Sequence, residues 1–83
     1  MNASGEHDRA MQSDFALRGD FIPLDALLKA SGLTSSGGAA TVLIASGAVQ
    51  VDGRTESRRT RKLRAGQVVQ FGDATIRLLA AIA

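Results

Sequence analysis

Cysteine, tryptophan and tyrosine are absent from this sequence of 83 residues, which also has only one histidine and three phenylalanines. Without cysteine the chain can form neither a disulfide nor a cysteine-based metal site. The absence of cysteine also fits the reducing conditions of the cytosol. No cluster of histidine, aspartate and glutamate has the spacing of metal ligands, so the sequence predicts no metal and no other cofactor.

Long apolar runs are missing as well. The first residues, MNASGEHDRAMQSD, have no apolar core and therefore do not read as a signal peptide. The longest apolar runs, such as LLAAIA at the C-terminal end, are far shorter than the roughly 20 residues that span a bilayer. These features predict a soluble, cytoplasmic protein with no membrane partner.

Catalytic arrangements are also lacking. The one histidine, His7, lies in a polar N-terminal stretch rather than beside a nucleophile. Asp20 and Asp25 are explained by the start of a helix, and residues 35–38 (SSGG) lack the spacing and the lysine of a P-loop. The sequence therefore predicts a protein that is not an enzyme.

Positive charge, in contrast, is concentrated in one part of the chain. Residues 1–31 hold three cations and five acids, whereas residues 32–83 hold seven cations and three acids. Like charges repel, and exposed ion pairs recover only about 0–1 kcal/mol each. The distribution therefore points to a polyanionic partner. Six of the cations lie within residues 54–64, where Glu56 is the one acid: Arg54, Arg58, Arg59, Arg61, Lys62 and Arg64.

Composition divides the chain into a tail and one domain. Residues 1–13 are polar and aperiodic, which predicts a disordered N-terminal tail. Residues 14–83 form the domain, and the alternation in residues 15–18 is typical of a short strand.

Two short helices are predicted next. In residues 23–33 (PLDALLKASGL) the leucines recur on one helical face. Residues 34–47 (TSSGGAATVLIASG) form the second helix, with Ser35 or Ser36 as its N-cap. Each range ends in or near a glycine suited to the left-handed stop position. The short link between the helices predicts that they pack as a pair.

The apolar period changes to two beyond the second helix. Residues 48–51 alternate, and Asp52-Gly53 is typical of a two-residue hairpin turn. Residues 66–73 (GQVVQFGD) and 74–80 (ATIRLLA) predict two further strands. The fold class is therefore α+β, with two short packed helices followed by a small, mostly antiparallel sheet. The apolar positions predict one shared core: Leu24, Leu27, Leu28, Leu43, Ile44, Val49, Val51, Val68 and Phe71.

Residues 54–64, which we call the basic segment, form the first candidate site. Arginine and lysine neutralise phosphates and release counterions, which supplies most non-specific affinity for nucleic acids. Ser57 and Thr60 add neutral donors for phosphate oxygens. Because the segment follows a hairpin strand, we expect it to project from the sheet edge, with Glu56 paired to one of its arginines.

The start of the second helix is another candidate. Ser36, Gly37 and Gly38 leave backbone N–H groups open, and a helix N-terminus of this kind can hold an anion. A tight turn between the helices explains the same residues at least as well.

Aromatic residues are too few for base stacking. Phe15, Phe21 and Phe71 all sit in apolar patterns, which predicts that they belong to the core. Stacking on exposed aromatics is how single strands are bound and how sheet surfaces read RNA. The composition therefore favours recognition of folded RNA by shape and phosphates.

Several of these segments resemble the S4-type RNA-binding domain, whose helix pair is called the αL motif. The match covers roughly residues 21–80, and within the family the chain is similar to the small stand-alone bacterial members. The matching positions are Leu24-Asp25 at helix one, Ser36 and Ala40 at helix two, then Ile44, Gly47, Val49, Val51, Asp52-Gly53 and Gly66-Gln67.

The chain also departs from the family pattern. Pro23 and Gly37 stand where the family often has arginine, and Thr41 occupies an often basic position. These departures place the electrostatic role on the basic segment. Lys29 matches a frequently basic position of helix one, so the resemblance implies that it contacts RNA too.

The predicted function is an RNA-binding module that recognises structured RNA through phosphate contacts. The resemblance implies RNA as the partner, and we expect ribosomal or transfer RNA, association with the ribosome, and a monomeric protein. One alternative is a protein–protein adapter that docks its basic segment on an acidic partner. Another is binding of double-stranded DNA, although the second helix, rich in Ala, Gly and Val, lacks a row of base-reading side chains.

Overall fold

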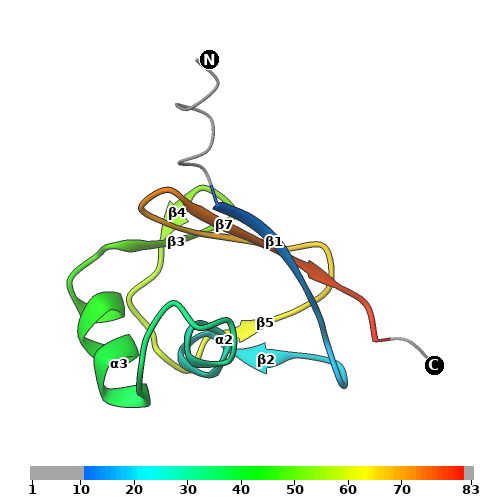
Figure 1. Ribbon diagram of the computed structural model, residues 1–83, viewed down its shortest axis with the longest axis horizontal. Coiled ribbons are helices and arrows are strands. Elements are labelled where there is room, and N and C mark those ends of the chain that lie inside the picture. The colour runs from blue at the N-terminus through cyan, green and yellow to red at the C-terminus, as the bar shows by residue number, and fades with distance from the viewer. Residues whose placement is uncertain (1–10, 82–83) are drawn as a thin grey trace, which may run out of the picture.

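Two short helices lie against one face of a five-stranded sheet in the computed structural model, which describes residues 11–81 (Figure 1). The helices are α2 (Leu24–Ala30) and α3 (Gly37–Ala45). In the order in which they lie side by side, the strands are β1 (Met11–Ala16), β7 (Ala74–Leu79), β6 (Val68–Phe71), β3 (Val49–Val51) and β4 (Arg54–Thr55). A separate two-stranded sheet pairs β2 (Ile22–Pro23) with β5 (Lys62–Leu63). This arrangement confirms the α+β class, although β1 and β2 precede the helices.

Helix α2 begins with backbone hydrogen bonds to the basic segment. Pro23, at the N-cap position, is extended and makes no side-chain cap. Instead, the N–H groups of Leu24 and Asp25 donate to the carbonyls of Arg61 and Arg59, each at 2.9 Å. These bonds satisfy N–H groups that a helix start leaves without partners. The first turn of α2 is therefore tied to residues far away in the sequence.

The remaining helix ends follow local rules. The Ser36 hydroxyl accepts a bond of 3.1 Å from the N–H of Ala39, which selects Ser36 over Ser35 as the cap of α3. Gly32 and Gly47 have φ of +83° and +82°. At Gly47, the N–H groups of residues 47 and 48 donate to the carbonyls of residues 44 and 43, the pattern of a Schellman motif. The predicted caps and stops are confirmed.

Alternation and turn chemistry set the register of the antiparallel strands. Asp52 and Gly53 have φ of +53° and +84°, so the predicted two-residue turn joins β3 to β4. Gly72, with φ of +58°, opens the turn between β6 and β7. Across β3 and β6, Val51 pairs with Val69. Paired residues share one face of a sheet, so Val69 lies with Val51 on the face that the helices cover.

The core lies between this face of the sheet and the two helices. Leu43 and Phe71, predicted as core, are half-buried against it. Val68 was wrongly predicted, because the register with β3 turns Val69 inward and leaves Val68 on the opposite face. The buried apolar cluster consists of Leu24, Leu27, Leu28, Ala40, Ile44, Val49, Val51, Leu63, Val69, Ile76 and Leu78.

Strand β1 corrects the predicted boundary of the tail. Residues 11–13, assigned to the tail, form the first half of β1, which runs parallel to β7 at the edge of the sheet. The side chains of Gln12, Ser13 and Asp14 are exposed. An edge strand of this kind is held by backbone pairing, for which a polar sequence carries no signal. The rest of the predicted tail, residues 1–10, lies outside the described residues.

None of the helices in residues 11–81 is long and apolar enough to cross a membrane.

Truncation should show that Met11–Ser13 stabilise the sheet. Removal of residues 1–13 should lower the Tm relative to removal of residues 1–10, because only the longer deletion shortens the β1–β7 ladder. Since each backbone hydrogen bond contributes about 0.5–1.5 kcal/mol net, we expect a loss of about 1–2 kcal/mol. For a domain of this size the difference in Tm should be about 5–15 °C, measured by circular dichroism. Equal Tm values would show that these residues add nothing to stability.

Candidate nucleic-acid interface

The basic segment is anchored at three points. At its start, the N–H of Glu56 donates to the carbonyl of Val49 on β3 at 3.0 Å. In its middle, the carbonyls of Arg59 and Arg61 accept from the first turn of α2. Near its end, Leu63 is fully buried and β5 pairs with β2. The prediction of a segment that projects from the sheet edge is therefore wrong, since after β4 the chain crosses from the sheet to the helices (Figure 1).

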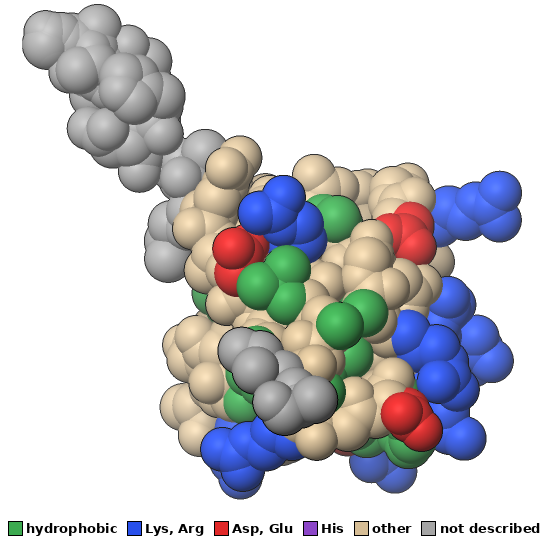
Figure 2. All heavy atoms as spheres, turned by 90° about the vertical axis from the view of Figure 1, so that its right-hand side faces the viewer, with side chains coloured by type: hydrophobic (Ala, Val, Ile, Leu, Met, Phe, Trp, Pro, Cys, Tyr) green, Lys and Arg blue, Asp and Glu red, His purple; other side chains and the backbone are tan. Residues whose placement is uncertain are grey.

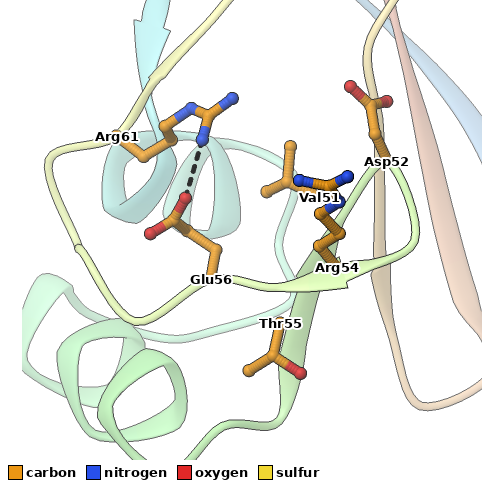
Figure 3. A pocket seen from close by; sticks show the side chains of 6 residues that line it. All are labelled: Val51, Asp52, Arg54, Thr55, Glu56 and Arg61. Carbon is orange, nitrogen blue, oxygen red and sulfur yellow. Dashed lines mark hydrogen bonds and ion pairs between the residues drawn. The ribbon is translucent and has the colours of Figure 1, made fainter.

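Residues 56–61 form the turn of the segment, and the carboxylate of Glu56 holds this turn together. Glu56 is only 8% exposed. One oxygen accepts from the backbone N–H and the Nε of Arg58, at 3.0 and 3.3 Å, and the other accepts from Nη1 of Arg61 at 2.8 Å. Figure 3 shows the Glu56 and Arg61 side chains pointing toward one another. The predicted pairing of Glu56 with an arginine is confirmed, and two arginines take part rather than one.

Hydrogen bonds also hold two carboxylates in their ionised form. The backbone N–H of Arg58 lowers the pKa of Glu56 most, and the Arg58 and Arg61 side chains add to this effect against the opposing effect of burial. The pKa of Asp52 is lowered chiefly by the N–H of Val68, at 3.0 Å, and then by the Gln67 amide, also at 3.0 Å. Asp52 thereby joins the hairpin turn to the start of β6.

The exposed arginines of the turn point their charge to solvent. The side chains of Arg58 and Arg59 are 70% and 60% exposed, whereas that of Arg61 is 34% exposed. Arg59 also lies 3.6 Å from the carboxylate of Asp25 on α2. Figure 2 shows Lys and Arg side chains gathered along the right-hand edge of one face of the molecule.

Two hollows border these side chains. One, of about 310 Å³, is lined by Arg58, Thr60, Arg61 and Lys62. The other, of about 420 Å³, lies between the β3–β4 hairpin and the turn of the segment, and Arg54 and Arg61 reach it from opposite sides (Figure 3). Its lining also includes the carboxylates of Asp52 and Glu56. The first hollow presents donors and cations, whereas the second is electrostatically mixed.

The end of the segment surrounds an exposed aromatic ring. Nζ of Lys62 lies 5.0 Å from the centroid of the Phe21 ring, and Cζ of Arg64 lies 5.8 Å from it. Cation–π contacts at exposed sites contribute about 0.5–1 kcal/mol. Phe21 is 41% exposed, so its prediction as a core residue is wrong. Phe15 and Phe71 are half-buried against the core.

The other predicted site residues lie on the helices. Lys29 is exposed on α2, one turn after Asp25 and hence on the helix face that Arg59 contacts. Ser36, Gly37 and Gly38 are exposed at the start of α3. Within residues 11–81, no hydrogen bond or ion pair joins this turn to the basic segment, and the Ser36 hydroxyl is engaged in capping. Lys29 thus lies on the helix that contacts the basic segment, whereas the start of α3 makes no hydrogen bond or ion pair with that segment among residues 11–81.

Metal chemistry has no visible site in this part of the chain. No group of three or more His, Cys, Asp or Glu side chains that could hold a metal ion occurs among residues 11–81.

Known proteins are similar to this chain in sequence and in fold. The S4 domain model matches residues 15–79. A relative from Escherichia coli (strain K12), named "Putative RNA-binding protein YbcJ", is 41% identical over 59 residues, which cover 71% of this chain and 84% of the relative. A relative from Shigella flexneri, named "Uncharacterized protein YbcJ", gives the same figures.

A solved structure extends the similarity to three dimensions. The solution structure of YbcJ from E. coli, described as revealing an αL motif involved in RNA-binding, is similar with a TM-score of 0.64 and 38% sequence identity. The match covers 81% of this chain and 86% of the other. The order of helices and turns, the matched residues 15–79 and this shared architecture lead to one conclusion, which the resemblance in the sequence predicted: the chain belongs to the S4 domain family.

Proposed function

We propose that this protein binds structured RNA, ribosomal or transfer RNA, through phosphate contacts made mainly by the basic segment. It acts as a cytoplasmic monomer, in association with the ribosome or with transfer RNA, and binds without catalysis. Support comes from the S4 family membership and from the relative named as RNA-binding. The residues of the basic segment suggest that the bound group is a phosphate.

The observation that carries the proposal is the hollow lined by Arg58, Thr60, Arg61 and Lys62. Guanidinium and ammonium groups only donate hydrogen bonds, and a phosphate oxygen only accepts them. The hydroxyl of Thr60 can donate as well. This set therefore matches a phosphate and carries no information about base sequence.

Preorganisation supports the same reading. Glu56 and the first turn of α2 hold the turn of the segment before any ligand arrives. A segment already ordered loses less conformational entropy on binding, so more of the electrostatic attraction appears as affinity.

Salt dependence should reveal the number of phosphate contacts. If about four cations of the basic segment meet phosphates, the logarithm of the binding constant should fall with the logarithm of salt concentration with a slope of roughly −3. Replacing Arg58 and Arg59 together by Ala should make the slope shallower by about 1–2. Affinities for different structured RNAs should fall by similar factors. The measurement is fluorescence anisotropy over a salt series.

Arg77→Ala is the matched control for this experiment. Arg77 is 63% exposed and pairs with the exposed Asp14 at 3.3 Å, on β7 and β1 rather than in the basic segment. Its loss removes one positive charge without removing a proposed phosphate contact, so the slope should stay unchanged. The melting curve of Arg77→Ala should stay close to wild type, because an exposed pair contributes about 0–1 kcal/mol. The double variant also loses the bond from Nε of Arg58 to the buried Glu56, so its Tm should be lower, but it keeps the backbone N–H bond at position 58 and should remain folded. An unchanged slope in the double variant, or the same change in Arg77→Ala, would contradict the proposal.

Glu56→Gln should test whether the turn must be held in place. The substitution removes the charge and replaces one of the two accepting oxygens by an NH₂ group, which cannot accept from Arg58 or Arg61. The loss of satisfied bonds to charged groups should cost about 1–3 kcal/mol of stability. RNA affinity should fall although the net positive charge rises by one, because the single amide oxygen cannot hold both Arg58 and Arg61 as the two carboxylate oxygens do. Tighter RNA binding would show that charge alone decides affinity.

The pH dependence of stability gives a second measurement on the same residue. The folded state lowers the pKa of Glu56, so its carboxylate stabilises the fold above the unfolded pKa of about 4.3. This contribution is lost as the pH falls through the lower folded value. Urea unfolding at pH 7 and at pH 3 should therefore show a smaller acid loss in Glu56→Gln than in wild type. Asp52→Asn should remove a further part, since the pKa of Asp52 is lowered too. Identical acid losses would exclude this linkage.

A further inference from the structure

An apolar hollow includes Phe21, whose ring lies close to Lys62, a residue of the proposed phosphate site. It has a volume of about 460 Å³ and is lined by Phe15, Arg18, Phe21, Ile22, Ala26 and Ala30, from β1, β2, α2 and the turn between the strands. Apart from Arg18, every lining residue is apolar. This size lies within the range of about 300–1,000 Å³ that is typical of small-molecule sites.

Three cations lie in or beside this apolar hollow. Arg18 is part of its wall, and Lys62 and Arg64 lie over the Phe21 ring. The acid nearest to Phe21 in sequence, Asp20, is exposed and does not line the hollow. An aromatic ring with cations around it suits a ligand that is flat and apolar on its faces and carries negative charge at its edge.

Lys62 connects this hollow to the proposed phosphate site. Its side chain lines the hollow of Arg58, Thr60 and Arg61, and its Nζ also lies 5.0 Å from the Phe21 centroid. Two adjacent sites, one for a phosphate and one for a flat ring, correspond to the two parts of a nucleotide.

We propose that the hollow beside Phe21 takes the base of an unpaired nucleotide, while Lys62 and its neighbours hold the adjoining phosphate. The inference rests on the proposed RNA-binding function and names the feature of the RNA that the protein selects. A base within a helix is stacked on both faces and cannot enter a hollow, so the RNA must offer a bulged, looped or single-stranded nucleotide. Stacking on Phe21 accepts any base, because every base has a π-face.

The test compares two RNAs with the same number of phosphates. One is a hairpin with a single bulged adenosine in its stem, and the other carries an abasic ribose at the same position. Wild type should bind the adenosine RNA about 5-fold or more tightly than the abasic RNA, in line with the usual contribution of a stacked base. The salt slopes should be equal, because the phosphates are the same.

Substitutions at Phe21 separate stacking from structural support. Phe21→Leu keeps an apolar side chain but has no π-face, so the affinity ratio of the two RNAs should fall toward one. Phe21→Trp keeps a ring and should keep the ratio. Because the chain has no other tryptophan or tyrosine, Phe21→Trp also supplies a single fluorophore. Its emission should change with the adenosine RNA and not with the abasic RNA.

Leu79→Trp is the matched fluorescence control. Leu79 is 38% exposed, close to the 41% of Phe21, but lies on β7 and does not line the hollow. Its emission should be the same with both RNAs. A wild-type ratio of one, or a ratio unchanged in Phe21→Leu, would overturn the base site and leave phosphate binding intact. Failure of wild type to bind either RNA would overturn both proposals.

Discussion

The shape of the basic segment depends on one buried carboxylate, that of Glu56, which accepts three hydrogen bonds. Six cations in eleven positions repel one another, and an exposed acid would offset little of that repulsion. Buried and fully bonded, the same acid instead fixes the turn in which Arg58 and Arg61 lie. The lowered pKa of Glu56 keeps its charge in place at neutral pH.

The second anchor is the start of helix α2. Pro23 offers no side-chain cap, and the carbonyls of Arg59 and Arg61 take the place of one. The basic segment therefore satisfies the first N–H groups of the helix, and the leucines of that helix belong to the core. The same contacts thus support both the core and the position of the basic segment. This coupling explains how a surface with so much like charge can still have a defined geometry.

The proposed function rests on a surface with two kinds of chemistry. The hollow around Thr60 is proposed for phosphates, and the ring of Phe21, which lies near Lys62, is proposed for a base. The start of α3 has Gly37 instead of a basic side chain, so the charge on this chain is concentrated beside α2.

Local interactions made much of the fold predictable from the sequence. The Ser36 cap, the glycine stops and the Asp52-Gly53 turn each depend on neighbours within a few residues, which the sequence displays directly. The leucine stripe of α2 and the family resemblance follow from spacing along the chain. The clustering of cations in the candidate interface was likewise evident from the order of residues in the sequence.

Only the tertiary structure decided the features that depend on which distant segments meet. Residues 11–13 form a strand because β7 offers them a free edge, and Val69 rather than Val68 is buried because β6 pairs with β3 in that register. Phe21 looked like a core residue until the pairing of β2 with β5 placed it at the surface beside Lys62. Side-chain periodicity records the preferences of a segment for water or core, but it does not record its partner, and the partner determines the pairing, the exposed face and the neighbouring charges.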